Sequence, residues 1–257
     1  MTNTPDLTTY DVILVNTSAG KDSCAMLDYV VTLATEQGVR DRVHAVHCDL
    51  GRVEWACTRD LAERQVAAYD LPFHVVSRPQ GDLLVQIEQR GMWPSSAARY
   101  CTSDQKRGQV NVLVNRLAAD CRARGIARPR ILNCLGLRAA ESSSRAKRPA
   151  FAPNARLTNS RKAVDEWNPI HAWSDAQVWD RIRAAGIETH PAYAQGFPRL
   201  SCVFCVFAPQ AQLLAAARLN PALAEEYAAL EGRIGHQFRP DVSIAAVVAQ
   251  ARDAQAA

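Results

Sequence analysis

Short apolar runs alternate with longer stretches of helical pattern through the first half of the chain, and this alternation constrains the fold more than any other feature. The strand-length runs are 12–15, 43–47, 73–76 and 131–135, and the helical stretches are 22–37, 54–69, 82–90 and 110–124. Strands that alternate with helices predict a mostly parallel sheet covered by helices. The uninterrupted apolar run at 12–15 is typical of a strand buried on both faces. We therefore expect a doubly wound α/β fold.

The character of the chain changes after this alternation ends. The later segments are a charged stretch at 138–162 that predicts a long loop or lid, a helix at 173–185 capped by Ser174 or Asp175, a Pro- and Gly-punctuated segment with a Cys pair at 186–208, and an Ala-rich tail of two or three helices at 209–255. We accordingly divide the chain into an α/β domain at 1–200 and a Cys-containing helical extension at 201–257.

Composition narrows the class of protein. With 257 residues, 48% hydrophobic and 22% charged, the chain can build a sizeable core. Its formal net charge of +4 is too small to indicate nucleic-acid binding by itself. The sequence has neither a signal-peptide pattern nor an apolar run of about 18 residues, so we expect a cytoplasmic protein without membrane contact. In that compartment the eight cysteines are expected as core thiols, metal ligands or catalysts rather than disulfides.

A turn of small residues follows the first expected strand and leads directly into a helix. At a helix start, backbone N–H groups and the helix dipole together favour an anion. Hydroxyl groups, one lysine and a glycine that permits close approach add to this preference, although the spacing is not that of a Walker A loop. An ordinary strand-to-helix turn is the alternative. The candidate phosphate site consists of Ser18, Ala19, Gly20, Lys21, Asp22 and Ser23.

The stretch 16–23, which reads N-T-S-A-G-K-D-S, resembles the pyrophosphatase (PP) loop of the adenine nucleotide alpha-hydrolase-like superfamily. That loop usually reads S-G-G-x-D-S, so Ala19 replaces one glycine, which is a mild change in size. The resemblance implies the adenine nucleotide alpha-hydrolase-like fold. It also implies that the loop holds the phosphates of ATP, or the sulfate or phosphate end of a sulfonucleotide.

Three further stretches resemble one branch of this superfamily, the phosphoadenosine phosphosulfate (PAPS) reductase-like proteins. They are G-L-R-A-A-E-S-S-S-R at 136–145, N-P-I with W-S-D-A-Q-V-W within 168–179, and P-A-Y followed by G and S-C-V-F-C within 191–205. These motifs, together with the phosphate loop, follow the family order from about residue 12 to residue 208. The resemblance therefore covers most of the chain and identifies 1–200 as a nucleotide-binding domain.

Charged residues of these motifs are candidates for holding the nucleotide. Arg138 and Arg145 can make bidentate contacts to phosphate or sulfate oxygens, and Glu141 can hold one guanidinium in place. Asp49 follows the second expected strand, where a loop at the carboxyl end of a strand can reach a nucleotide. A solvated basic loop is the alternative for the arginines, and a plain turn is the alternative for Asp49.

Cys202 and Cys205 form a C-x-x-C pair, and iron–sulfur, zinc and dithiol redox roles all fit that spacing. Cys101 lies where the iron–sulfur sulfonucleotide reductases carry a Cys-Cys pair, with a threonine here in the second position. The resemblance implies a [4Fe–4S] cluster on Cys101, Cys202 and Cys205, with zinc or no metal as alternatives. Either one iron is open, or a fourth ligand comes from Cys134, Cys48 or a His. Cys24 and Cys121 lie in helical stretches and are expected to be buried thiols.

The reductases of this branch use a nucleophilic thiolate beyond the C-x-x-C pair, and no cysteine follows Cys205. The resemblance therefore favours an ATP-using relative. There the loop, Mg²⁺ and the arginines hold ATP while a substrate oxygen attacks the α-phosphorus, pyrophosphate leaves, and sulfur then displaces AMP. Such catalysis rests on positioning and charge stabilisation. Lys21, Asp22 and Arg138 are the candidate catalytic residues.

The implied partners follow from the same resemblance. It extends to the DNA phosphorothioation sulfur-transfer enzymes, which implies a nucleic-acid substrate contacted by the Arg- and Lys-rich stretch 138–162. An adenine nucleotide and a sulfur-donor protein such as a cysteine desulfurase are the other expected partners, and an oligomer stays open. Two rival functions remain, a PAPS or adenosine phosphosulfate (APS) reductase and a module that binds nucleotide without turnover.

Overall fold

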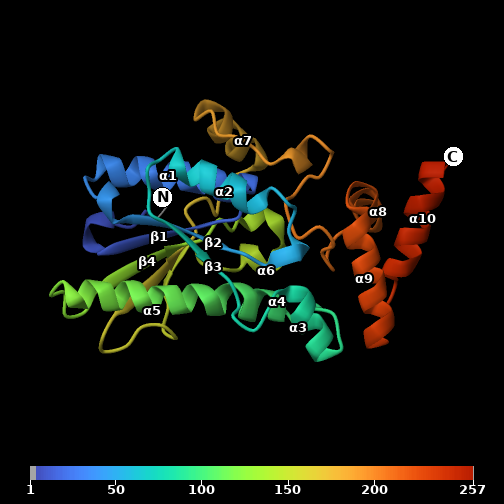
Figure 1. Ribbon diagram of the computed structural model, residues 1–257. Helices are drawn as coiled ribbons and strands as arrows, with labels where there is room; N and C mark the ends of the chain where they lie inside the picture. Colours follow the sequence, from blue (N-terminus) through green and yellow to red (C-terminus); the bar gives the residue numbers. More distant parts are fainter. Residues whose placement is uncertain (1–3, 257) are drawn as a thin grey trace. The chain divides into compact units, whose positions relative to one another are not determined.

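The computed structural model describes residues 4–256. The chain forms two compact units, and each is described by itself (Figure 1). The first unit comprises Met1–Cys48, Cys57–Val76 and Val110–Leu200, and the second comprises Asp49–Ala56, Ser77–Gln109 and Ser201–Ala257. The expected division after residue 200 coincides with one unit boundary. Two earlier segments join the second unit as well, so its parts are not contiguous in sequence.

The first unit is built on a six-stranded sheet with the order β3-β2-β1-β4-β6-β5 (Figure 1). Its strands are β1 Val12–Thr17, β2 Val43–Cys48, β3 Phe73–Val76, β4 Arg130–Cys134, β5 Phe151–Pro153 and β6 Ala163–Trp167. Neighbouring strands run parallel, except that β5 is antiparallel to β6. This arrangement confirms the predicted mostly parallel sheet.

Alternate side chains of β1 enter two separate cores. Ile13 and Val15 pack in a cluster with residues of α1 Lys21–Glu36, α2 Thr58–Ala67 and α7 Asp175–Ala184. Val12 and Leu14 pack in a second cluster with residues of α5 Gly108–Ala123. Because strand side chains alternate between faces, the two clusters lie on opposite faces of the sheet. Helices on both faces confirm the predicted doubly wound α/β fold.

The order of strands creates a topological switch point between β1 and β4. The chain moves from β1 through β2 to β3 and then returns to the other side of β1 with β4. In open α/β sheets, ligands bind outside the carboxyl ends of the strands at such a point. The loop before α1 and the segment after β4 therefore lie where this class of fold places ligands.

The charged segment 138–162 is not the uniform loop or lid that we predicted. It contains η5 Ala139–Glu141, α6 Ser143–Ala146 and β5, and β6 follows it directly. Neither strand carries a clear strand signal, because β5 ends in a proline, which suits an edge strand, and β6 holds two acidic residues. The structure satisfies both acids: the Tyr10 hydroxyl donates to Asp165 at 2.8 Å, and the Asn154 amide donates to Glu166 at 2.8 Å.

The second unit is helical. Its elements are η3 Gly51–Val53, α3 Leu83–Arg90, α4 Tyr100–Thr102, a π-helical turn at Ser103–Arg107, α8 Gln210–Leu219, α9 Pro221–Ile234 and α10 Ile244–Ala256. Trp93 anchors its core by stacking on Tyr227 with ring centroids 5.4 Å apart and meeting the edge of Phe238 at 5.1 Å. The predicted helical tail is thus confirmed. Within residues 4–256, no helix combines the length and the apolar character that crossing a bilayer requires.

A buried carboxylate, Glu231, ties α10 to α9. Glu231 is 8% exposed, and its oxygens accept the N–H groups of Phe238 (2.6 Å), Ile244 (3.2 Å) and Ala245 (3.1 Å) and the hydroxyl of Ser243 (2.7 Å). A negative charge at a helix start is stabilised by the free N–H groups and the helix dipole. We expect Glu231→Ala to lower the free energy of unfolding by about 3 kcal/mol in urea denaturation, because buried donors lose a charged acceptor.

Glu225→Ala is the matched control on the same helix. Glu225 pairs with Arg252 at the surface, with 46% of the Glu225 side chain exposed, and such pairs contribute less than about 1 kcal/mol. Glu231→Gln keeps the volume but offers one acceptor oxygen in place of two, so it is expected to lose an intermediate amount. Equal losses in the two alanine variants would contradict the anchoring role of Glu231.

Candidate functional site

The loop between β1 and α1 is closed by its own serine side chains. The Ser23 hydroxyl donates to the Gly20 carbonyl at 2.8 Å and accepts the Ser18 N–H at 3.1 Å. The two serine hydroxyl oxygens lie 3.3 Å apart. Gly20 is the N-cap of α1 and has no side chain with which to cap it, so the first N–H groups of the helix depend on partners from elsewhere. The strand, turn and helix predicted around this loop are present.

Ala19 adopts a left-handed backbone conformation, with a φ of 56°. This conformation costs a non-glycine residue about 1–2 kcal/mol. The Ala19 methyl group is completely buried in a cluster with Leu61 and Ala62, and burying one such group contributes roughly 0.8 kcal/mol in the opposite direction. The replacement of glycine is therefore more than the change in size that the sequence indicated, since it sets backbone strain against packing.

Lys21 begins α1 and is held at both ends by the segment around η6 Pro191–Tyr193. Lys21 is 3% exposed. Its backbone N–H donates to the Tyr193 hydroxyl at 2.7 Å, and its ammonium group donates to the Pro198 carbonyl at 2.9 Å. Its Nζ also lies 3.7 Å from the carboxylate of Asp175. The sequence marked the P-A-Y motif as a resemblance but assigned no role to Tyr193 or Pro198.

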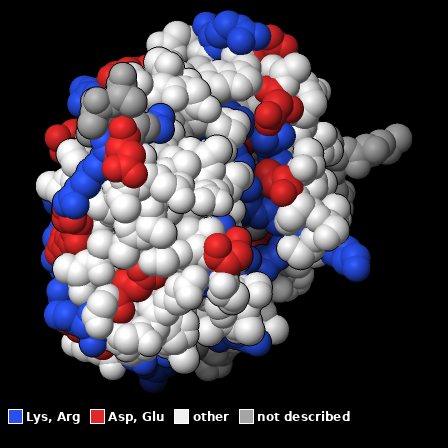
Figure 2. All heavy atoms as spheres, turned by 90° about the vertical axis from the view of Figure 1, so that its right-hand side faces the viewer, with Lys and Arg blue, Asp and Glu red and all other residues white. Residues whose placement is uncertain are grey.

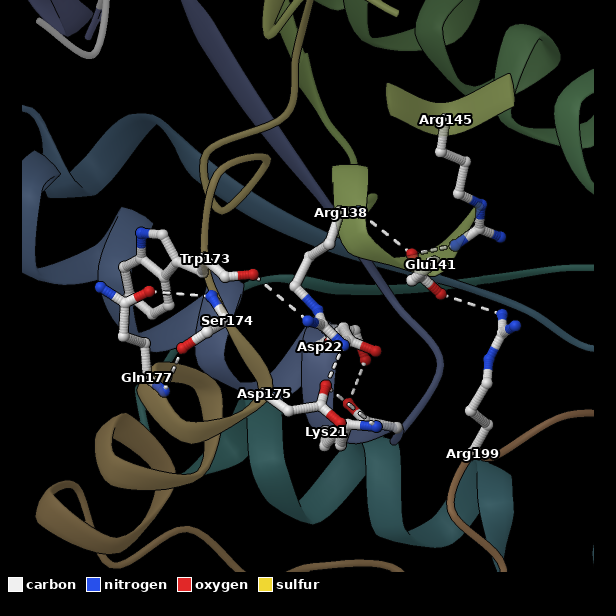
Figure 3. A network of polar contacts seen from close by, with 12 residues as sticks. Lys21, Asp22, Arg138, Glu141, Arg145, Trp173, Ser174, Asp175, Gln177 and Arg199 are labelled. Carbon is white, nitrogen blue, oxygen red and sulfur yellow. Dashed lines mark hydrogen bonds and ion pairs between the residues drawn. The ribbon is translucent and has the colours of Figure 1, made fainter. Parts of the chain in front are cut away.

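The capping box of α7 places Asp175 beside this lysine. The Ser174 hydroxyl accepts the Gln177 N–H at 3.2 Å, and the Gln177 side chain accepts the Ser174 N–H at 2.8 Å (Figure 3). Of the two predicted caps, Ser174 is the one that the structure shows. Asp175 thereby takes the first position of α7, from which it contacts Lys21 and Arg138.

The Arg138 guanidinium lies at the centre of a buried polar network (Figure 3). Its Nε donates to Asp22 at 2.5 Å, and its terminal nitrogens donate to Asp175 and to the Trp173 carbonyl. Only 4% of the Arg138 side chain is exposed. Burial raises the pKa of Asp22, although Arg138 and Lys21 oppose that shift. Arg138 therefore binds protein groups here, and its predicted contact with a phosphate stays a prediction.

Glu141 holds two further guanidinium groups. Its side chain is 6% exposed. One carboxylate oxygen accepts the Arg138 backbone N–H at 3.0 Å and the Arg145 guanidinium, and the other accepts the Arg199 guanidinium at 2.9 Å (Figure 3). The sequence led us to expect one such guanidinium. Arg199 was missed because it lies outside any charged run, and its place between two matched motifs was the available signal.

Gly136 brings the segment after β4 against the first turn of α1. A Cβ atom on Gly136 would lie 3.3 Å from the backbone C and O of Asp22 and from the backbone N of Ser23. Backbone atoms cannot rotate away as a side chain can. We expect Gly136→Ala to shift the first turn of α1 by a few tenths of an ångström and to weaken ATP binding about tenfold in calorimetry, because anion binding at a helix start depends on the placement of its N–H groups.

Gly232→Ala is the control for this substitution. Gly232 lies within α9, and a Cβ atom there would meet no heavy atom within 4 Å. Alanine in place of an interior helical glycine stabilises a protein by about 1 kcal/mol, and we expect this variant to bind ATP like the wild type. Unchanged ATP affinity in Gly136→Ala would show that this close approach does not position the loop.

Asp49 belongs to the second unit. Its carboxylate accepts the Gly51 N–H at 2.8 Å, and Gly51 has a φ of 73°, which is typical of a tight turn. The turn that we gave as the alternative is therefore present. The predicted contact between Asp49 and a nucleotide stays a prediction.

The three candidate cluster ligands, Cys101, Cys202 and Cys205, all lie in the second unit. Burial raises the pKa of Cys202 to about 12; Lys106 opposes this shift, and Cys205 and Cys101 add to it. The three sulfurs are therefore near enough to interact electrostatically. As they stand, however, no group of three or more His, Cys, Asp or Glu side chains among residues 4–256 is arranged to hold a metal ion.

The other cysteines lie in the first unit. Cys134 is completely buried in the core beside β4, and Cys48 ends β2. Cys24 and Cys121 are buried, as predicted. In its described residues the second unit thus offers three thiols and no fourth. This donor set fits a cluster with three protein ligands better than a structural zinc ion, which takes four.

Residues 12–208 match the family described as "Phosphoadenosine phosphosulfate reductase domain". An uncharacterized 37.8 kDa protein of Escherichia phage 186 is 27% identical over 139 residues, which cover 54% of this chain and 39% of that protein. The adenosine 5′-phosphosulfate reductase of Allochromatium vinosum is 34% identical over 70 residues, which cover 27% of this chain and 25% of that protein. The matched region thus spans less than half the length of either relative.

Solved structures share the fold of this chain. The crystal structure of Candida glabrata FMN adenylyltransferase superimposes with a TM-score of 0.50 at 11% sequence identity, covering 77% of this chain and 56% of that one. At this level of identity the likeness shows the α/β fold alone.

Proposed function

Because this chain belongs to the phosphoadenosine phosphosulfate reductase domain family, we propose that it is an ATP-dependent sulfur-transfer enzyme that adenylates its substrate and releases pyrophosphate. One observation carries the proposal. The start of α1 lies at the β1/β4 switch point with a glycine N-cap, two hydroxyl groups and the buried ammonium of Lys21. These are the features that recognise a phosphate chain at the start of a helix.

In the proposed reaction the residues of this chain act by positioning and by charge. The first N–H groups of α1 and the hydroxyls of Ser18 and Ser23 donate to phosphate oxygens. The Lys21 ammonium stabilises the negative charge that builds up as a substrate oxygen attacks the α-phosphorus and pyrophosphate leaves. Asp22 and Arg138 form a rigid ion pair behind the loop, which keeps the loop in place while charge moves.

Mg²⁺ is expected with ATP, and the residues shown at the loop do not supply a dedicated site for it. Asp22 and Asp175 both accept hydrogen bonds from Arg138. We therefore assign no protein ligand to the ion, and the nucleotide phosphates would hold it, as is common for Mg²⁺ in nucleotide enzymes.

We further propose that Cys101, Cys202 and Cys205 hold a [4Fe–4S] cluster. The support is the chemistry of the donor set, three thiols and no fourth within the described residues of one unit. Such a cluster would supply one iron with an open coordination position for a sulfur atom. A sulfur-donor protein such as a cysteine desulfurase is part of this proposal.

A nucleic acid is the proposed sulfur acceptor. On the face shown in Figure 2, acidic side chains lie among the basic ones around a broad uncharged area. That face therefore presents no continuous basic field of the kind that dominates non-specific nucleic-acid binding. Contact with a nucleic acid would depend on local groups of arginines, among them those of the stretch 138–162.

The proposal is tested by anaerobic purification followed by a pyrophosphate assay with ATP. DNA, tRNA and small sulfur acceptors are supplied in turn, and iron and sulfide are measured in the same preparation. Acceptor-dependent pyrophosphate release, with absorption near roughly 400 nm from the cluster, is the expected result. ATP binding without any product would instead identify a nucleotide-binding module.

A sulfonucleotide reductase is the second candidate. It is favoured by the match to the Allochromatium vinosum adenosine 5′-phosphosulfate reductase. The discriminating assay supplies adenosine phosphosulfate and reduced thioredoxin and measures sulfite. Sulfite release without pyrophosphate release from ATP would replace the adenylation proposal with this one.

A further inference from the structure

We propose that Arg145 and Arg199 form a second phosphate-binding site, a guanidinium clamp that Glu141 holds in place. Its ligand is a phosphate group other than those in the loop before α1. That phosphate is either a ribose phosphate of the nucleotide or a phosphodiester of a nucleic acid, since both present the same oxygens. The clamp deepens the proposed function, on which it rests only for the identity of the molecule that carries the phosphate.

The geometry of Glu141 leaves most donors of the clamp unused. Its two carboxylate oxygens each take one guanidinium, Arg145 on one and Arg199 on the other. A guanidinium has five N–H donors, and the side-chain contacts shown among the described residues use one from each arginine. The side chains of Arg145 and Arg199 are 27% and 56% exposed, whereas that of Glu141 is 6% exposed. The buried acid thus fixes two partly exposed forks, and such forks suit phosphate oxygens.

Charge distinguishes the clamp from the network beside it. Lys21 and Arg138 face Asp22 and Asp175, so two positive charges meet two negative charges. At the clamp, two guanidinium groups share one carboxylate. One positive charge therefore stays uncompensated among these groups. An approaching phosphate is attracted to the clamp, where the neighbouring network is already balanced.

Two chain segments link the clamp to the phosphate loop. The Arg138 backbone donates to Glu141, and the Arg138 guanidinium donates to Asp22 at the start of α1. Pro198, whose carbonyl binds the Lys21 ammonium, directly precedes Arg199. Figure 3 shows Glu141 between the two clamp arginines, with the Arg138 guanidinium apart from them against Asp22 and Asp175. One bound molecule with phosphates in the loop can therefore place a further phosphate in the clamp.

The test compares Arg199→Ala with Arg183→Ala. Arg183 carries the same charge in an exposed pair with Asp180, 66% exposed, so it controls for the loss of one positive charge. The first arm measures by calorimetry the ratio of the affinities for adenosine 3′,5′-bisphosphate and AMP, which differ by one phosphate. The second arm measures by fluorescence anisotropy the affinity for single-stranded DNA across a salt series.

We expect Arg199→Ala to weaken one of these two interactions about tenfold, the loss typical of a charged hydrogen bond. A fall in the bisphosphate-to-AMP ratio identifies a nucleotide phosphate. Weaker DNA binding with a salt slope smaller by about one identifies a phosphodiester. The clamp is overturned if both arms change no more than they do with Arg183→Ala. Neither arm uses ATP turnover, so a failure of the pyrophosphate assay would count against the proposed function and leave these readouts intact.

Discussion

A Lys21→Met variant is expected to bind ATP about 100-fold more weakly than the wild-type chain while it keeps its fold. Lys21 is 3% exposed and donates to the Pro198 carbonyl at 2.9 Å, so its ammonium group is fixed at the start of α1. Removing a fixed, buried positive charge from a phosphate site costs about 3 kcal/mol. The methionine side chain fills the space of the lysine stem, so the thermal unfolding midpoint serves to verify folding beside the calorimetric affinity.

Two further variants sharpen this experiment. Lys147 is exposed, and Lys147→Met removes the same charge without touching the loop, so its ATP affinity is expected to match the wild type. Lys21→Arg keeps the charge but places a larger, forked group in a buried position, and it is expected to restore little. ATP binding that is unaffected by Lys21→Met, or equally weakened by Lys147→Met, would remove the basis of the proposed function.

Arg138→Met is expected to lower the free energy of unfolding by about 3 kcal/mol in urea denaturation at neutral pH. Removing one partner of a buried ion pair costs about 3–5 kcal/mol, because the other charge stays buried without compensation. The lower end applies here, since Asp22 is 20% exposed and Asp175 is 65% exposed. Arg183→Met, at an exposed pair, is expected to change stability by less than about 0.5 kcal/mol.

The deficit of Arg138→Met is expected to shrink as the pH falls. Burial already raises the pKa of Asp22, and Arg138 opposes that rise, so the variant raises the pKa of folded Asp22 further above its unfolded value. Below that pKa the folded variant binds the proton more tightly than the unfolded chain does, and acidification recovers stability. Asp22→Asn in the Arg138→Met background should recover stability at neutral pH. A deficit independent of both pH and Asp22 would show that lost packing, rather than an unpaired charge, destabilises the variant.

Local patterns were sufficient where an element is recognised by its own residues. The apolar run of β1 and the turn before α1 follow from a few consecutive residues, and so does the Ser174 cap of α7. Strands β5 and β6 were missed because their signals are not local. β5 ends in Pro153 and pairs at the edge of the sheet, and the acids of β6 are satisfied by Tyr10 and Asn154, which are distant or separately folded neighbours.

The phosphate loop and the motif arginines were recognised from sequence, whereas their partners were not. Lys21 meets Tyr193, which is 172 residues away. Arg138 meets Asp22 across 116 residues. Such pairings depend on the order of the strands and on the segment that follows α7, and neither is encoded in a short window of sequence. The distinction between a phosphate-binding arginine and one bound to protein carboxylates therefore required the structure.

By itself the sequence determined the alternation of strands and helices, the small-residue loop at the start of α1 and the three cysteines of the second unit, because periodicity, turn chemistry and spacing are properties of neighbouring residues. The tertiary structure alone decided that Arg138 is held by Asp22 and Asp175 and that Glu141 joins Arg145 to Arg199. Those contacts form only when the segments after β4 and after α7 pack against one loop, since a buried charge takes whichever opposite charge the fold places beside it.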